Sequence, residues 1–221
     1  MGFRVQRVQM DALLREIDRE YDIYAPKRFV GGGAFSGTDC IRYGIIHSID
    51  EVEFKEKSQY SFKEILTPLS QTILYFTENE VKEADPPKKG AVIFLRSCDL
   101  HALKRLDDIY LGNGPADYYY KRIRDNIKIV LIGCKHSFES CFCVSMGTNK
   151  ADNYDLSIDW TEDGVQLDCK NEWFAELLSG NETADISPAF VTENRFVLCA
   201  VILECPADIL HQGDEQEVND K

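Results

Sequence analysis

Four of the eight cysteines in this 221-residue chain fall within one stretch, and their type and spacing suggest a shared site. They are Cys98, Cys134, Cys141 and Cys143. Four thiolates that converge would suit a tetrahedral metal ion such as zinc, or an iron–sulfur cluster. Each cysteine taken alone is better explained as a small buried apolar residue. The Cys-x-Cys pair at 141 and 143 is also less specific than the cysteine runs of ferredoxins.

The elements that must position these cysteines are two strands and the helix between them. The short apolar runs Ala91–Leu95 and Ile127–Ile132 have the composition of buried strands. Between them, Asp99 can cap a helix, and the apolar residues that follow it have helical spacing. They are Leu100, Leu103, Leu106 and Ile109. A second short helical segment is expected over Asp117–Asn126.

Strand, helix and strand in this order predict a parallel pair with a right-handed crossover. Parallel strands end at the same edge of a sheet, which is also where ligands bind in such folds. Cys98 and Cys134 should therefore lie near each other, and the loop that carries the other two cysteines can fold back to the same edge. We predict an α/β fold with a βαβ core around residues 91–134, an added β-hairpin and peripheral helices. A mixed α+β arrangement remains open.

The rest of the chain supplies peripheral elements. Three consecutive glycines at 31–33 lack the remaining residues of a phosphate-binding loop, so we expect a hairpin or turn there. The other expected elements are a helix over Met10–Glu20, a helix over Ser61–Leu69 with a capping box, a helix or strand over Gln71–Thr77, a hairpin formed by Asp155–Trp160 and Val165–Asp168, and a helix over Glu172–Leu178.

Composition excludes several classes of function. The net charge of −13 argues against nucleic-acid binding, because phosphate binding needs clustered Lys and Arg. No apolar segment has the length of a membrane span, and no basic start precedes an apolar leader. Cysteines in such a chain are expected to be thiols or metal ligands in the cytoplasm. His101 and His136 flank the cysteine-bearing strand ends, where a hydrogen-bonded or surface role is the simpler expectation.

Several segments together resemble the iron–sulfur subunit of anaerobic sulfite reductase, in a wider family that includes the β subunits of sulfhydrogenases. The most specific are FLRSCDLHALKRLD (94–107) and CFCVSMG (141–147). The others are YAPKRF (24–29), FSGTDCIRYG (35–44), SQTILYFTE (70–78) and YDLSID (154–159). The resemblance extends from about Tyr24 to about Asn194.

The resemblance implies an electron-transfer role within an oxidoreductase complex rather than a complete enzyme. It implies partner subunits that carry flavin, which accepts electrons from NADH, and sirohaem, which reduces sulfite. It also implies iron–sulfur clusters, and the family cysteines matched here are Cys98, Cys134, Cys141 and Cys143. These are the expected ligands of a 4Fe-4S cluster. Arg96 and the backbone N–H groups of residues 140–144 are candidate donors to its sulfurs.

The chain departs from this family after Phe196. Family members carry a two-cluster ferredoxin module there, whereas this chain reads VLCAVILECPADILHQGDEQ. We therefore expect one α/β domain over residues 1–196 and a divergent, partly disordered tail over residues 197–221, from a truncated, frameshifted or split chain. Two alternatives stay open. One is a non-catalytic docking subunit with structural zinc or no metal, and the other is a thiol-redox enzyme that uses the Cys-x-Cys pair.

Overall fold

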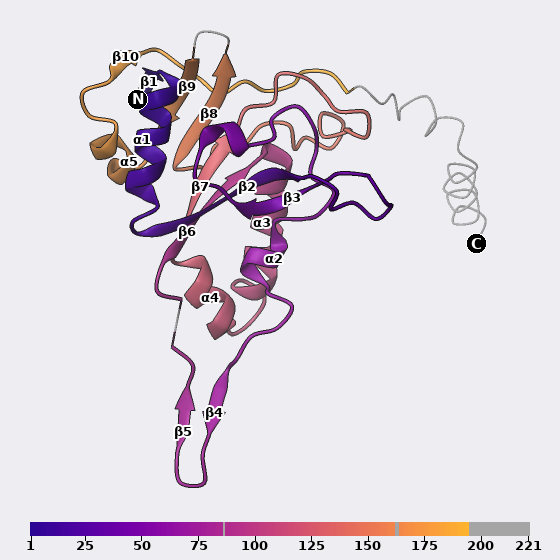
Figure 1. Cartoon of the computed structure of the whole chain (residues 1–221), viewed down its shortest axis with the longest axis vertical. Helices are drawn as coiled ribbons and strands as arrows, with labels where there is room; N and C mark the ends of the chain where they lie inside the picture. The colour runs from indigo at the N-terminus through magenta and orange to yellow at the C-terminus, as the bar shows by residue number, and fades with distance from the viewer. Residues whose placement is uncertain (86, 162–163, 195–221) are drawn as a thin grey trace, which may run out of the picture.

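A mixed eight-stranded sheet runs through the computed structural model, which describes residues 1–85, 87–161 and 164–194 (Figure 1). Across the sheet, the strands are β10 (Glu182–Ala184), β1 (Gly2–Val5), β9 (Gly164–Cys169), β8 (Leu156–Thr161), β7 (Ile127–Ile132), β6 (Gly90–Leu95), β2 (Tyr21–Phe29) and β3 (Cys40–Ile45). The four neighbours β8, β7, β6 and β2 are parallel, and the outer pairings are antiparallel. The expected α/β class is confirmed.

Helices cover both faces of the sheet (Figure 1). Helices α1 (Arg7–Ile17) and α5 (Glu172–Leu177) pack on one face, and α3 (Ser97–Tyr110) and α4 (Tyr118–Arg124) pack on the other with the short α2 (Lys63–Leu66). A 3-10 turn, η1 (Ile49–Glu51), completes the helical elements of the described residues.

The sheet separates two apolar cores because its side chains alternate between the two faces. In β6, Val92 and Phe94 belong to the core beneath α1 and α5. Ile93 and Leu95 belong to the core beneath α3 and α4. A strand buried on both faces is continuously apolar, as the sequence of β6 shows.

The predicted βαβ unit is confirmed in its order and its strand bounds. β6 and β7 pair in parallel, with Leu95 opposite Leu131. One detail of the prediction was wrong, because α3 begins at Ser97 and not after Asp99. Asp99 lies within the first turn, where its carboxylate accepts a hydrogen bond from the backbone N–H of Arg96 at 3.4 Å. The acidic group therefore still satisfies a free N–H at the helix start.

The expected peripheral elements formed with altered bounds. The first helix was expected over Met10–Glu20 and begins earlier, at Arg7. The expected hairpin is present as β8 and β9, although residues 162–163 of its turn lie outside the described part. The capping box at Ser61 was wrong, because α2 begins at Lys63 and Glu64 instead forms an ion pair with Arg42 at 2.8 Å. Ser61 still accepts a hydrogen bond from the backbone N–H of Lys63 at 3.3 Å, so only the part of the box expected from Glu64 is lost to the ion pair.

Residues 69–83 form a projection that we call the arm (Figure 1). It contains β4 (Leu74–Phe76) and β5 (Val81–Glu83), which pair with each other in a separate two-stranded sheet. The segment Gln71–Thr77 thus contains a strand, one of its two expected forms. All six residues of β4 and β5 are exposed. The apolar composition of the segment therefore does not reflect burial in the core.

The described residues 1–85, 87–161 and 164–194 contain no helix long and apolar enough to cross a membrane. A single α/β domain over residues 1–196 stays a proposal, and the expected tail at 197–221 lies outside the described part of the chain.

The two kinds of apolar residue should respond differently to truncation. Leu131 is fully buried in the central strand, so Leu131→Ala should lower the free energy of unfolding by about 2–5 kcal/mol. Leu74 lies in the exposed arm, and Leu74→Ala should change it by less than about 0.5 kcal/mol. Urea denaturation followed by circular dichroism measures both. Equal losses in the two variants would contradict this division between core and arm.

Candidate functional site at the carboxyl edge of the sheet

The four cysteines lie at the carboxyl ends of the parallel strands, as the sequence predicts. Cys98 lies in the first turn of α3, three positions after Leu95, and Cys134 lies three positions after Leu131. Because Leu95 and Leu131 are paired, the two cysteines leave the sheet side by side. Cys141 and Cys143 follow in the loop between β7 and β8. All four side chains are partly buried free thiols.

The raised pKa values of Cys98 and Cys143 show that other cysteines of the set lie nearby. Burial is the largest of the causes that raise the pKa of Cys98 to about 12; the nearby Asp99, Cys134 and Cys143 act in the same direction, and Lys57 opposes them. Burial also raises the pKa of Cys143, and the next contributions come from Cys141 and Cys134. The structure therefore brings the four predicted residues into one electrostatic group.

The side chains are not in a finished coordination geometry. Among the described residues, no group of three or more His, Cys, Asp or Glu side chains is arranged to hold a metal ion as it stands. The chemistry of the donor set fits an iron–sulfur cluster or zinc, since both take thiolates. A loop rearrangement and the loss of thiol protons would have to accompany binding.

Arg96 is a fixed cation beside the cysteines. Its side chain is only 5% exposed, and Nη1 donates to Sγ of Cys134 at 3.4 Å. Nη2 donates to the carbonyl oxygen of Phe54 at 3.2 Å, and the guanidinium lies 4.6 Å from the centre of the Phe138 ring. A charged donor held in this way would stabilise negative charge on the sulfur of Cys134.

The loop that carries Cys141 and Cys143 is fastened to the rest of the domain. Oγ of Ser97 donates to the carbonyl of Asn149 at 2.8 Å, and the backbone N–H of Cys134 donates to the carbonyl of Ala189 at 2.9 Å. The backbone N–H of Val144 donates to Oδ1 of Asn194 at 3.1 Å. This N–H, which the sequence suggested as a donor to sulfur, is therefore already engaged.

The two histidines near the site have different surroundings. Nε2 of His101 is 2.8 Å from the carbonyl oxygen of Lys150, so His101 has the hydrogen-bonded role expected as the simpler case. His136 lines a cavity of about 340 Å³ beside Cys134, together with Arg96 and Phe138. His136 is thus the histidine with access to the site.

Nothing in the sequence singles out Asp159, which lies in the wall of the same cavity. Asp159 is 3% exposed, and this burial raises its pKa. The hydrogen bond from the backbone N–H of Ala189 at 2.9 Å and the positive charge of Lys135 lower the pKa in part. Its Oδ1 has no hydrogen-bond partner among the described residues. A Cβ at Gly133 would come within 1.8 Å of this oxygen, so the backbone can pass only because residue 133 is glycine. An inward-facing Asp in an alternating strand carries no local sequence signal.

Comparison with known proteins gives one informative relative. The chain is 33% identical to Sulfhydrogenase 2 subunit beta of Pyrococcus furiosus over 153 residues, which are 68% of this chain and 42% of that protein. The chain therefore spans less than half the length of this relative. No protein-family profile matches the chain, and no solved structure matches it.

The raised pKa of Cys98 can be tested in the reduced, metal-free protein. A pKa of about 12 means that the thiolate, which is the reactive form, is scarce at pH 8 and increases up to and beyond pH 11. Iodoacetamide labelling with mass spectrometry should therefore give a Cys98 rate that still rises above pH 10. In denaturant the labelling rate should level off at a lower pH, just above the ordinary pKa of a cysteine thiol. A folded-state plateau near pH 9 would contradict the assignment.

Proposed function

We propose that this chain is an iron–sulfur electron-transfer subunit of an oxidoreductase complex. The proposed cluster ligands are Cys98, Cys134, Cys141 and Cys143. The observation that carries the proposal is their grouping at one sheet edge, where each of Cys98 and Cys143 has its pKa raised by other members of the set. Four thiolates are the usual protein ligands of a 4Fe-4S cluster.

A bound cluster would supply one-electron storage, and the residues of this chain would control its environment. Cys98 has to lose a proton to become a ligand, so loading should weaken as pH falls. The Arg96 guanidinium, on Sγ of Cys134, favours added negative charge at that sulfur. The aromatic ring of Phe138 covers the guanidinium and limits the access of water.

The relative in Pyrococcus furiosus supports the role of one subunit in a larger complex, since its name describes a subunit. More specifically, we propose a part in anaerobic sulfite reduction, with electrons passing from a flavin subunit that oxidises NADH toward a sirohaem subunit, in the cytoplasm. The sequence segments that resemble the iron–sulfur subunit of anaerobic sulfite reductase support this choice. The chain would be a component of the reductase and not a complete enzyme.

A second candidate is a docking subunit of the same complex with structural zinc or no metal. Within the described part of the chain, no three potential ligands are in place to hold a metal ion, which favours the metal-free form of this candidate. Metal analysis separates the two proposals, because zinc and iron–sulfur clusters differ in metal and in sulfide.

Replacing two of the proposed ligands should remove the cluster. Cys141→Ser with Cys143→Ser should reduce bound iron by most of its amount, because the remaining two thiolates cannot complete a four-thiolate site. The matched control is Cys169→Ala, a buried cysteine whose Sγ bonds the carbonyl of Asn171 at 3.2 Å, which should retain iron. Iron and acid-labile sulfide are measured after anaerobic purification. Unchanged iron in the double variant would contradict the ligand assignment.

The charge of Arg96 should affect the midpoint potential of the cluster. Arg96→Gln removes a cation from Cys134 and should make the cluster harder to reduce, which lowers the potential. Arg96→Lys keeps the charge and should lie closer to the wild type. A redox titration followed by absorbance compares the three proteins. Equal potentials in the Gln variant and the wild type would show that the guanidinium does not act on the cluster.

A further inference from the structure

The arm exposes more apolar surface than a projection in water should. Six large apolar side chains of residues 69–83 are between 41% and 97% exposed. They are Leu69, Ile73, Leu74, Tyr75, Phe76 and Val81. Neither of the two apolar cores includes a residue of the arm. An exposed cluster of this kind is typical of a binding surface.

The arm also has little to stabilise it alone. An isolated two-stranded hairpin is marginally stable in water, and three-residue strands such as β4 and β5 bury few contacts. Its base is nevertheless fixed to α4, because Nη1 of Arg122 bonds Oε1 of Glu83 at 3.0 Å and the carbonyl of Ala84 at 3.2 Å. The base is therefore positioned, while the apolar side chains beyond it lack a counterpart among the described residues.

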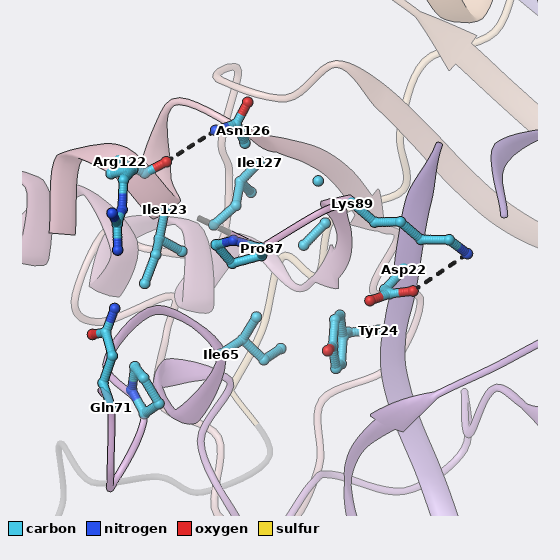
Figure 2. A pocket seen from close by; sticks show the side chains of 13 residues that line it. Asp22, Tyr24, Ile65, Gln71, Pro87, Lys89, Arg122, Ile123, Asn126 and Ile127 are labelled. Carbon is cyan, nitrogen blue, oxygen red and sulfur yellow. Dashed lines mark hydrogen bonds and ion pairs between the residues drawn. The ribbon is translucent and has the colours of Figure 1, made fainter. Parts of the chain in front are cut away.

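A cavity of about 230 Å³ opens at the base of the arm, at the amino ends of β6 and β7 (Figure 2). Figure 2 shows Ile65, Ile123 and Pro87 around it, with Tyr24 on one side and Arg122 on the other. An occupant with an apolar side chain would fit this cavity, because Ile65, Ile123 and Ile127 line it.

Charge indicates the kind of partner. The turn and the base of the arm differ in charge: Glu78 and Glu80 lie in the turn, whereas the base carries Glu83 and Asp85 together with Lys82, Lys88 and Lys89. Glu83 pairs with Arg122, and Asp85 pairs with Lys82 at 3.5 Å. Glu78 and Glu80, in the turn, remain to attract cations. A second copy of this chain, with a net charge of −13, would bring like charges together. The same charge disfavours an anionic membrane.

We propose that the arm and the cavity at its base form a docking surface for a different protein, whose contact segment is apolar and bordered by Lys or Arg. One apolar side chain of that segment enters the cavity. The surface lies at the amino ends of β6 and β7, whereas Cys98 and Cys134 follow the carboxyl ends of these strands. The proposal does not depend on a cluster being bound.

A photo-crosslinking experiment on the complex purified from its source tests the proposal. Benzoylphenylalanine replaces Phe76 in the full chain, and the control carries it in place of Val8, which is 81% exposed on α1. The expected result is one crosslinked polypeptide at position 76, different from this chain, whose crosslinked peptide has apolar residues beside Lys or Arg. A crosslink to a second copy, or the same products from both positions, would overturn the proposal.

A variant in the arm completes the test. Tyr75→Ser with Phe76→Ser should reduce recovery of that polypeptide roughly tenfold, since buried aromatic side chains dominate such interfaces. Val8→Ser should leave recovery unchanged. The unfolding midpoint and the iron content of the arm variant should equal those of the wild type, which separates this proposal from the cluster proposal. Unchanged recovery, or arm-dependent binding to phosphatidylcholine vesicles, would overturn it.

Discussion

The parallel pairing of β6 with β7 is the constraint on which the candidate site depends. Because Leu95 lies opposite Leu131, the two chains leave the sheet at the same level and carry Cys98 and Cys134 out together. The pairing is stabilised from both faces, by side chains that alternate between two apolar cores. A shift of one residue in register would move every side chain of one strand to the opposite face of the sheet, and the packing of both cores would be lost. The packing energy of the sheet thus fixes the spacing of the cysteines.

Charge at this edge is arranged around the same strand ends. Arg96 is buried just after β6 and holds Sγ of Cys134, while Asp99 binds the backbone N–H of Arg96 from inside the first turn of α3. Burial of Cys98 and the nearby carboxylate of Asp99 raise the pKa of that thiol and keep it protonated when no metal is bound. At this edge, the Arg96 guanidinium favours the thiolate form of Cys134, whereas the Cys98 thiol resists deprotonation. Metal binding would change this balance, because a metal ion replaces the thiol proton.

The pattern of apolar residues in the sequence predicted the central strands, but it did not predict where the helices begin. Short apolar runs with Val and Ile predicted β6 and β7 within a residue, because a strand buried on both faces has few alternatives. The helix start at Ser97 was missed because Asp99 caps the helix from its third helical position and not from the position before the helix. The capping box at Ser61 failed because Glu64 pairs with Arg42, which comes from a distant part of the sequence.

The same limit applied to the site. The place of the four cysteines at one sheet edge could be predicted from strand order, while their role as ligands stays a prediction. Asp159 and Gly133 could not be, because their contact links two strands and leaves no spacing in the sequence. The exposed arm was also not foreseen, since an apolar segment that meets another protein has the composition of one that is buried in its own core.

The metal content and absorption spectrum of protein purified without oxygen test the electron-transfer role most directly. We predict roughly four iron atoms per chain with matching acid-labile sulfide, and a broad visible band that bleaches with dithionite. One zinc ion, or no metal at all, would contradict the electron-transfer role. The chain would then be better described as a docking subunit whose cysteines have a structural purpose.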